Sequence, residues 1–317
     1  MIKVPKNPWT YIKTFIGIII FYLVLSKIDL GRTIETLKTM QHPFFYMPLS
    51  LFLVVLVYVI GALCIYIILL PLKRVSLFRL FKYTSISWAV GLIIPAADIL
   101  SLSYLLKKDG INWGPSLVIS FIDKSITIIV LGVFSLLAFM KFMSIYQTLY
   151  LFFILISGLI LIAAVMSSTG RRAIRKFILR KYSNKFAGFS RLLKWYLLNR
   201  KDLLALNALF TVIKLLITAE ITQLIFLSLG ARVPLSYILV ITSAMLIIKI
   251  VPTPVNFFGL REAVHLTMAV FFYNQIGIES SITLGTYIIV FLLNYIYALA
   301  VLAFANYNTL IKETAHV

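Results

Sequence analysis

Charged side chains stand inside otherwise apolar stretches of this sequence, and they are the residues best suited to chemistry. The set is Asp98, Asp123, Lys124, Lys214, Glu220, Lys249, Arg261 and Glu262. At bilayer depth a charge costs about 2.5–3.5 kcal/mol on insertion scales, so such residues usually face the protein interior and pair with one another. Two interpretations follow: ion pairs that fix helix packing, or a site for a charged ligand.

Arg261 and Glu262 favour the second interpretation because they follow a break in an apolar segment. Pro252 and Pro254 each remove a backbone donor and clash with the preceding turn, which interrupts a helix. The Arg261 guanidinium is a fork of donors suited to phosphate. A helix that restarts near Gly259 would add free N–H groups to the same anion site. We expect Arg261 to be the main ligand of a phosphate group.

The remaining charges are expected to complete or support this site. Glu262 or Asp98 would balance the arginine or carry a proton. Asp123 would hold Lys249 or Arg261, although a packing role is the stronger interpretation for Asp123. Lys214 and Glu220 are six residues apart, on opposite faces of a helix, so we do not expect them to pair with each other. The expected ligand-binding residues are Arg261, Glu262, Asp98, Asp123, Lys124, Lys249 and Asn256.

The composition places these residues in a membrane protein. Hydrophobic residues make up 62% of the 317 residues, against about 45–50% in soluble domains, and the mean hydropathy is +1.02. The chain reads as a single membrane domain over residues 1–317. A net charge of +20 is typical of cytoplasmic loops rich in lysine and arginine rather than of nucleic-acid binding. Cys64 is the only cysteine, and no metal-ligand spacing is present, so we expect no metal and no cofactor.

The apolar pattern predicts an all-α fold with about six full spans and two proline-broken re-entrant hairpins. The spans are expected at about residues 11–26, 44–70, 116–140, 149–166, 203–229 and 282–306. The first hairpin is expected at about 83–106, broken at Pro95, and the second at about 237–275, broken at Pro252 and Pro254. A small amphipathic helix is expected within 27–43. The loop at 170–201 is strongly basic and is expected to lie on anionic lipid.

The distribution of basic loops supports the hairpin over its alternative at 83–106, a single proline-kinked span. A re-entrant hairpin leaves every strongly basic loop, and both termini, on the cytoplasmic side. A plain span would place one flanking basic group outside. The second hairpin then enters from the outside, and each hairpin is followed by a Gly-Ile step, Gly110-Ile111 or Gly277-Ile278. This inverted repeat is the construction of alternating-access sites.

Two stretches resemble a known family. Pro252-Thr253-Pro254 followed by Gly259-Leu260-Arg261-Glu262-Ala263 is similar to a signature of flippase-like membrane proteins, which are related to the transmembrane region of lysylphosphatidylglycerol synthase. Ile94-Pro95, Tyr104-Leu105-Leu106-Lys107-Lys108 and Asp123-Lys124 resemble an earlier, looser motif, and the likeness covers roughly residues 10–307. The family's glycines after the proline pair appear here as Val255 and Asn256. The resemblance implies lipid translocation, and the soluble aminoacyltransferase domain of synthase members is absent from this sequence.

We therefore expect a lipid flippase, not an enzyme, in the cytoplasmic membrane of a prokaryote. The expected partners are a phospholipid or lipid-linked substrate and anionic membrane lipids, with a homo-oligomer left open and no nucleic acid. Two alternatives remain: a transporter of a small polar solute, and a non-catalytic membrane partner of a lipid-modifying enzyme. A solute carrier predicts an enclosed polar cavity, whereas a flippase predicts a groove open sideways to lipid.

Overall fold

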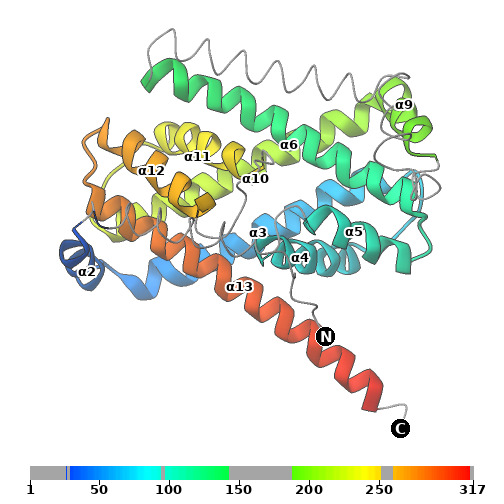
Figure 1. Ribbon diagram of the computed structural model, residues 1–317, viewed down its shortest axis with the longest axis horizontal. Coiled ribbons are helices and arrows are strands. Elements are labelled where there is room, and N and C mark those ends of the chain that lie inside the picture. The colour runs from blue at the N-terminus through cyan, green and yellow to red at the C-terminus, as the bar shows by residue number, and fades with distance from the viewer. Residues whose placement is uncertain (1–25, 27–28, 94–96, 143–187, 251–259, 315–317) are drawn as a thin grey trace, which may run out of the picture.

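A computed structural model describes residue 26 and residues 29–93, 97–142, 188–250 and 260–314. Within these ranges the chain is helical and contains no strand (Figure 1). The helices are α2 (Leu30–Lys38), α3 (Pro43–Leu69), α4 (Leu77–Ile93), α5 (Ala97–Lys108), α6 (Trp113–Phe142), α9 (Phe189–Asn199), α10 (Lys201–Ser228), α11 (Leu235–Ile250), α12 (Leu260–Asn274) and α13 (Ser280–Thr314). The expected spans at 11–26 and 149–166, and most of the basic loop at 170–201, lie outside the described residues.

Four of the described helices are long and apolar enough to cross a membrane: α3, α6, α10 and α13. They match the spans predicted at 44–70, 116–140, 203–229 and 282–306. Two pairs of shorter helices lie between them in sequence: α4 and α5 precede α6, and α11 and α12 precede α13. The prediction of an all-helical membrane protein is confirmed, while the total number of spans stays a prediction.

The predicted amphipathic helix is α2, and it marks one end of the molecule. Its N-cap is Asp29, whose carboxylate accepts the N–H of Arg32 at 2.9 Å. Arg32 also pairs with Glu279, just before α13, at 3.1 Å. The N–H of Gln41 donates to the Ser228 carbonyl at 2.7 Å. The start of α3, the end of α10 and the start of α13 therefore lie at the same end as α2.

Helices α4 and α5 fold back on each other as a helical hairpin. Arg79, near the start of α4, pairs with Asp109, just after α5, at 2.9 Å, and Lys73 donates to the Asp109 carbonyl. The first arm begins earlier than predicted, at Leu77 rather than residue 83. The reason is local: Ser76 Oγ accepts the Arg79 N–H at 3.4 Å. Leu80 then packs in the core.

Helices α11 and α12 form the second hairpin, and both of its open ends contact one residue of α6. The Phe142 ring lies 5.9 Å from the ring of Tyr237, at the start of α11. It also lies 5.6 Å from the ring of Phe272, at the end of α12. Hairpin α11–α12 therefore opens at the C-terminal end of α6, in the upper left of Figure 1.

The two hairpins open at opposite ends of α6. Tyr104, in the last turns of α5, lies 6.5 Å from Trp113, the first residue of α6. Figure 1 shows α4–α5 beside the start of α6 and α11–α12 beside its end. Each hairpin has its own core: Leu80 and Leu106 belong to one buried cluster, and Ile238 and Phe272 belong to another.

The predicted Gly-Ile steps close both hairpins with one backbone geometry. Gly110 and Gly277 each have φ of 79°, a left-handed conformation that glycine adopts without a steric penalty. The N–H of Ile111 returns to the Leu106 carbonyl at 3.3 Å, and that of Ile278 returns to the Tyr273 carbonyl at 3.0 Å. Both are Schellman-type ends. The end of α10 at Gly230 uses the same turn, so this geometry is shared by three helix ends and is not particular to the hairpins.

Candidate functional site

The described parts of the hairpin arms are shorter than the four apolar spans. Helix α5 has 12 residues, or about 18 Å at 1.5 Å per residue. Helix α12 has 15 residues, or about 22 Å. The hydrocarbon core of a bilayer is about 30 Å thick.

Both hairpin tips reach the middle of α6. Asp98, in the first turn of α5, contacts Lys124 of α6. Leu246, close to the end of α11, packs in a cluster with Val130 and Leu131 of α6. Lys124 and Val130 are separated by about 9 Å of helix rise. The two tips therefore converge on one short stretch of a membrane-spanning helix.

The ion pair between Asp98 and Lys124 ties the first tip to α6. Lys124 Nζ lies 2.6 Å from Asp98 Oδ2, with side-chain exposures of 37% and 22%. Gly91 of α4 makes this position possible. A Cβ added to Gly91 would lie 2.9 Å from the Asp98 Cβ, closer than side chains approach. The described partner of Asp98 is Lys124, and the expected balance between Asp98 and Arg261 stays a prediction, because the Arg261 side chain lies outside the described part of the structure.

Asp123 faces the other way from its neighbour Lys124. Its side chain is 9% exposed, and its Oδ1 accepts a hydrogen bond from Asn207 Nδ2 of α10 at 3.3 Å. Asn207 Nδ2 also donates to the Cys64 carbonyl of α3 at 3.0 Å. Asn207 therefore joins the three spans α3, α6 and α10. The predicted pairing of Asp123 with Lys249 or Arg261 stays a prediction, because those two side chains lie outside the described part of the structure.

At the second hairpin tip, the structure describes the helices α11 and α12 but not the charged side chains. The described part of α12 begins at Leu260 and contains Arg261 and Glu262, while the predicted restart near Gly259 stays a prediction because residues 251–259 are not described. The side chains of Lys249, Arg261 and Glu262 are not among those described. Pro95, Pro252, Pro254, Asn256 and Gly259 also lie outside the described residues. Lys214 and Glu220 are half-buried on α10 and form no ion pair with any described residue.

The sequence analysis missed a polar stripe on α10. Asn207, Thr211, Lys214 and Thr218 recur at the spacing of one helix face. Cys64 Sγ lies 3.9 Å from Thr211 Oγ1, so this face looks onto α3. The 3.6-residue recurrence of polar residues in an apolar helix was the signal that could have revealed it.

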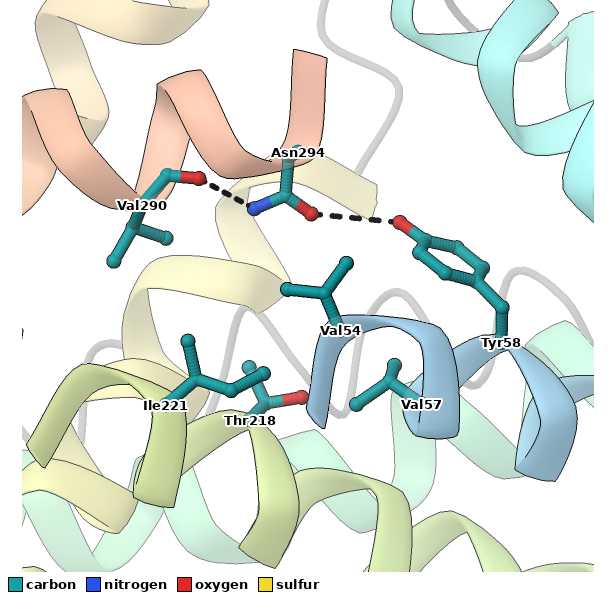
Figure 2. A pocket seen from close by; sticks show the side chains of 7 residues that line it. All are labelled: Val54, Val57, Tyr58, Thr218, Ile221, Val290 and Asn294. Atoms are coloured by element: carbon teal, nitrogen blue, oxygen red, sulfur yellow. Dashed lines mark hydrogen bonds between the residues drawn. The ribbon is translucent and has the colours of Figure 1, made fainter. Parts of the chain in front are cut away.

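The stripe leads to a small cavity between α3, α10 and α13. Its volume is about 50 Å³, and it is lined by Val54, Val57, Tyr58, Thr218, Ile221, Val290 and Asn294. Figure 2 shows Tyr58 pointing toward Asn294: the Tyr58 hydroxyl donates to Asn294 Oδ1 at 3.4 Å, and Asn294 Nδ2 donates to the Val290 carbonyl at 2.7 Å. The cavity has room for a few water molecules but not for a lipid headgroup.

An aromatic cluster beside this cavity fixes the first hairpin to the long spans. The rings of Tyr58 and Tyr297 are stacked at 4.4 Å, and Trp88 of α4 lies 4.5 Å from Tyr58. Ser85 Oγ of α4 and the Tyr297 hydroxyl are hydrogen-bonded at 2.7 Å. Hairpin α4–α5 is thus held by α6 on one side, through Asp98, and by α3 and α13 on the other.

Basic side chains collect at the end of the molecule where α4–α5 opens. They are Lys73, Arg74, Arg79, Lys82, Lys107, Lys108, Arg191, Lys194, Arg200 and Lys201. Helix α9 is anchored there by Leu193 and Tyr196, both buried, and the Tyr196 hydroxyl donates to the Ile68 carbonyl. Burial raises the pKa of Tyr196 to about 12, so this donor keeps its proton at neutral pH.

A comparison with protein-family models decides the relationship. The model of the lysylphosphatidylglycerol synthase TM region matches residues 11–302. The chain belongs to this family. The resemblance seen in the proline and Arg-Glu motifs is confirmed, and with four apolar spans the chain is a multi-pass membrane protein. No curated protein and no solved structure matches the chain.

Proposed function

We propose that this member of the synthase transmembrane-region family moves a phospholipid, or a lipid-linked headgroup, across the cell membrane. One observation carries the proposal: two hairpins open at opposite ends of α6, and their tips converge on its middle beside an ion pair at membrane depth. We take the hairpins as re-entrant and as halves of an inverted repeat. Transporter sites are commonly built from interrupted helices that meet at the midplane.

The proposed substrate group is a phosphate. Arg261 lies in the first turn of α12, where free N–H groups and the helix dipole favour an anion. Lys124 supplies a second positive charge on α6, held by Asp98 while no substrate is bound. Glu262, Asp123, Lys249 and Asn256 are assigned to the same site. We assign no catalytic residue, because the sequence offers no nucleophile beside a base.

We propose that the basic end of the molecule faces the cytoplasm. Loops rich in lysine and arginine stay on that side during insertion, and the end at which α4–α5 opens carries most of the described cations. Hairpin α11–α12 then enters from the outside. Helix α9, with Arg191 and Lys194 exposed, would rest on the anionic headgroups of the inner leaflet.

The test follows translocation of fluorescent phospholipids in liposomes. Dithionite destroys outer-leaflet label, and loss of the protected inner pool reports translocation. We expect rapid loss with wild type and none beyond empty liposomes with Arg261→Ala. Arg232→Ala is the matched control, because it removes the same charge at an exposed turn after α10, and it should keep the wild-type rate.

Each outcome of the liposome assay distinguishes between the candidate functions. Equal rates in wild type and Arg261→Ala, both above empty liposomes, would keep translocation and remove Arg261 from the site. Absence of translocation for anionic, zwitterionic and lipid-linked substrates, with and without a proton or sodium gradient, would reject the proposal. The solute transporter and the enzyme partner would then be the remaining candidates.

A further inference from the structure

The open end of hairpin α11–α12 holds a lysine over an aromatic ring. Lys141, one residue before the end of α6, places its Nζ 3.8 Å from the centre of the Tyr237 ring at the start of α11. The Phe142 ring packs against the same tyrosine at 5.9 Å. A cation at this distance is attracted by the electrons of the ring face. The ring therefore holds the Lys141 ammonium at this end of α6.

The open end of hairpin α4–α5 repeats this arrangement. Lys108 Nζ lies 5.2 Å from the centre of the Tyr104 ring, and Lys107 Nζ lies 5.9 Å from the centre of the Trp113 ring. The two rings lie 6.5 Å apart. We call these four residues the first mouth, and we call the group at the open end of α11–α12 the second mouth. At each mouth a tyrosine of the hairpin meets an aromatic residue of α6, with a lysine held over a ring.

The donors at both mouths are not used inside the protein. Lys107, Lys108 and Lys141 form no ion pair within the described part of the chain. Asp109, which follows Lys108, is paired with Arg79 at 2.9 Å. The hydroxyls of the two mouth tyrosines make no hydrogen bond with a described residue. Because an ammonium carries three donors and a tyrosine hydroxyl one, each mouth presents several donors and a full positive charge to an anion.

The length of α6 places the two mouths at opposite surfaces of a bilayer. The helix has 30 residues, or about 45 Å of rise, and a bilayer with its headgroup regions is about 40–45 Å thick. Trp113 and Phe142 are the first and last residues of α6, which is long and apolar enough to cross a membrane. Each mouth of a membrane-crossing α6 therefore lies at the headgroup level of one leaflet. The anion that every phospholipid carries at this level is its phosphate.

We propose that each mouth binds the phosphate of a phospholipid in its own leaflet. Lys141 and Tyr237 are the ligands at the second mouth, and Lys107, Lys108 and Tyr104 are the ligands at the first. An ammonium already held by a ring loses less side-chain freedom on binding than a mobile lysine does, so the mouths bind a phosphate more tightly than other exposed lysines at the same level. This binding does not require transport. That the mouths load and release the transported lipid rests on the proposed function.

Fluorescence quenching at the second mouth tests the proposal without a transport measurement. The full chain carries Cys64→Ala and a bimane label at Asn274→Cys, two residues after Phe272, whose ring contacts Phe142. It is placed in nanodiscs of digalactosyldiacylglycerol, a lipid without phosphate, and a phosphatidylcholine with a nitroxide on its headgroup is added. We expect quenching that saturates at a low fraction of this probe. Lys141→Gln should raise the half-saturating fraction several-fold.

Matched variants separate a built site from general attraction to charge. Lys38→Gln removes an exposed charge from the same end of the molecule, away from the mouth, and should leave the half-saturating fraction unchanged. Lys141→Arg keeps a cation over the ring and should retain binding. Tyr237→Phe keeps the ring but removes the hydroxyl, so it should raise the half-saturating fraction by less than Lys141→Gln does.

The first mouth is tested in the same way with a label at Asn112→Cys. Lys107→Gln with Lys108→Gln should raise the half-saturating fraction several-fold, whereas Lys194→Gln with Lys201→Gln, which removes as much charge from the same end, should not.

Three results would overturn the proposal. The first is quenching that grows in proportion to the probe without saturating. The second is an equal effect of the mouth variants and their matched controls. The third is displacement of the probe by inorganic phosphate as readily as by unlabelled phospholipid, which would assign the mouths to a free anion. Loss of translocation in the liposome assay with saturable quenching intact would reject the proposed function and leave the lipid sites standing.

Discussion

A single missing methyl group sets the position of the charge pair at the first hairpin tip. Gly91 of α4 leaves room for the Asp98 side chain, and Asp98 reaches Lys124 at 2.6 Å. With both side chains partly exposed, the pair is worth less than a fully buried one. Its value lies in geometry, because it holds the first turn of α5 against the middle of α6.

Gly91→Ala tests this arrangement. The added Cβ would lie 2.9 Å from the Asp98 Cβ, so α4 and α5 must separate, and we expect a loss of about 1–3 kcal/mol in stability. Gly61→Ala is the control, because a Cβ at this position of α3 meets no atom within 4 Å and alanine favours a helix. Thermal unfolding in nanodiscs should show a lower melting temperature for Gly91→Ala only. Equal behaviour of the two variants would contradict the close approach.

At the scale of elements, length explains why two apolar segments turn back. The described arms rise about 18–25 Å, less than a core of about 30 Å, and the two open ends of each hairpin lie at one end of α6. Local signals set the bounds: Ser76 accepts the Arg79 N–H at the start of α4, and glycines with φ of 79° close α5 and α12. Whether the hairpins re-enter the membrane depends on which side their ends face.

Cysteine labelling measures those sides directly. The chain has one cysteine, Cys64, which is buried, so Cys64→Ala provides a clean background. In it, Arg74→Cys and Lys108→Cys flank hairpin α4–α5, and Arg232→Cys and Asn274→Cys flank hairpin α11–α12. We expect a membrane-impermeant maleimide to label the first pair only from the cytoplasm and the second pair only from outside. Labelling of Arg74→Cys and Lys108→Cys from opposite sides would show that α4–α5 is a kinked span.

For the whole molecule, the main asymmetry is charge. The end with α9 carries ten described cations against Asp109 and Asp202. The opposite end carries Arg32, Lys38, Lys141 and Arg232 against Asp29, Glu35 and Glu279. Each cation near an anionic surface gains about 1 kcal/mol, so in the proposed topology this difference would orient the protein and draw α9 toward the headgroups. Leu197 and Leu198 of α9 are exposed and would enter the interface.

Removing positive charges from α9 should weaken the binding of the protein to anionic lipid. At about 1 kcal/mol per charge, Arg191→Gln with Lys194→Gln should cost roughly tenfold or more in affinity of the detergent-solubilised protein for vesicles rich in phosphatidylglycerol. The effect should fade at high salt because the charges are then screened. Arg232→Gln with Lys38→Gln removes as much charge at the opposite end and is the control. Vesicle co-sedimentation across a phosphatidylglycerol series checks it, and equal losses in both double variants would refute a specific role for α9.

The sequence by itself determined the class and most helices of this protein. Apolar runs long enough to span a bilayer are a local property, so α3, α6, α10 and α13 were predicted close to their observed bounds. The breaks predicted at Pro95, Pro252 and Pro254 lie outside the described residues and stay predictions. The start of α4 was missed because a serine cap and the buried Leu80 outweighed the basic character of residues 73–82.

Only the tertiary structure decided which polar residues meet. The pair between Asp98 and Lys124 was not predicted, and it forms where Gly91 lets α4 and α5 approach closely. Asn207 drew no attention in the sequence, yet it links α3, α6 and α10. Pairing between residues 84 or 143 positions apart depends on helix register and on the facing of each side chain. The packing of all the spans together sets the register of each helix and the direction of each side chain. No single stretch of sequence determines either.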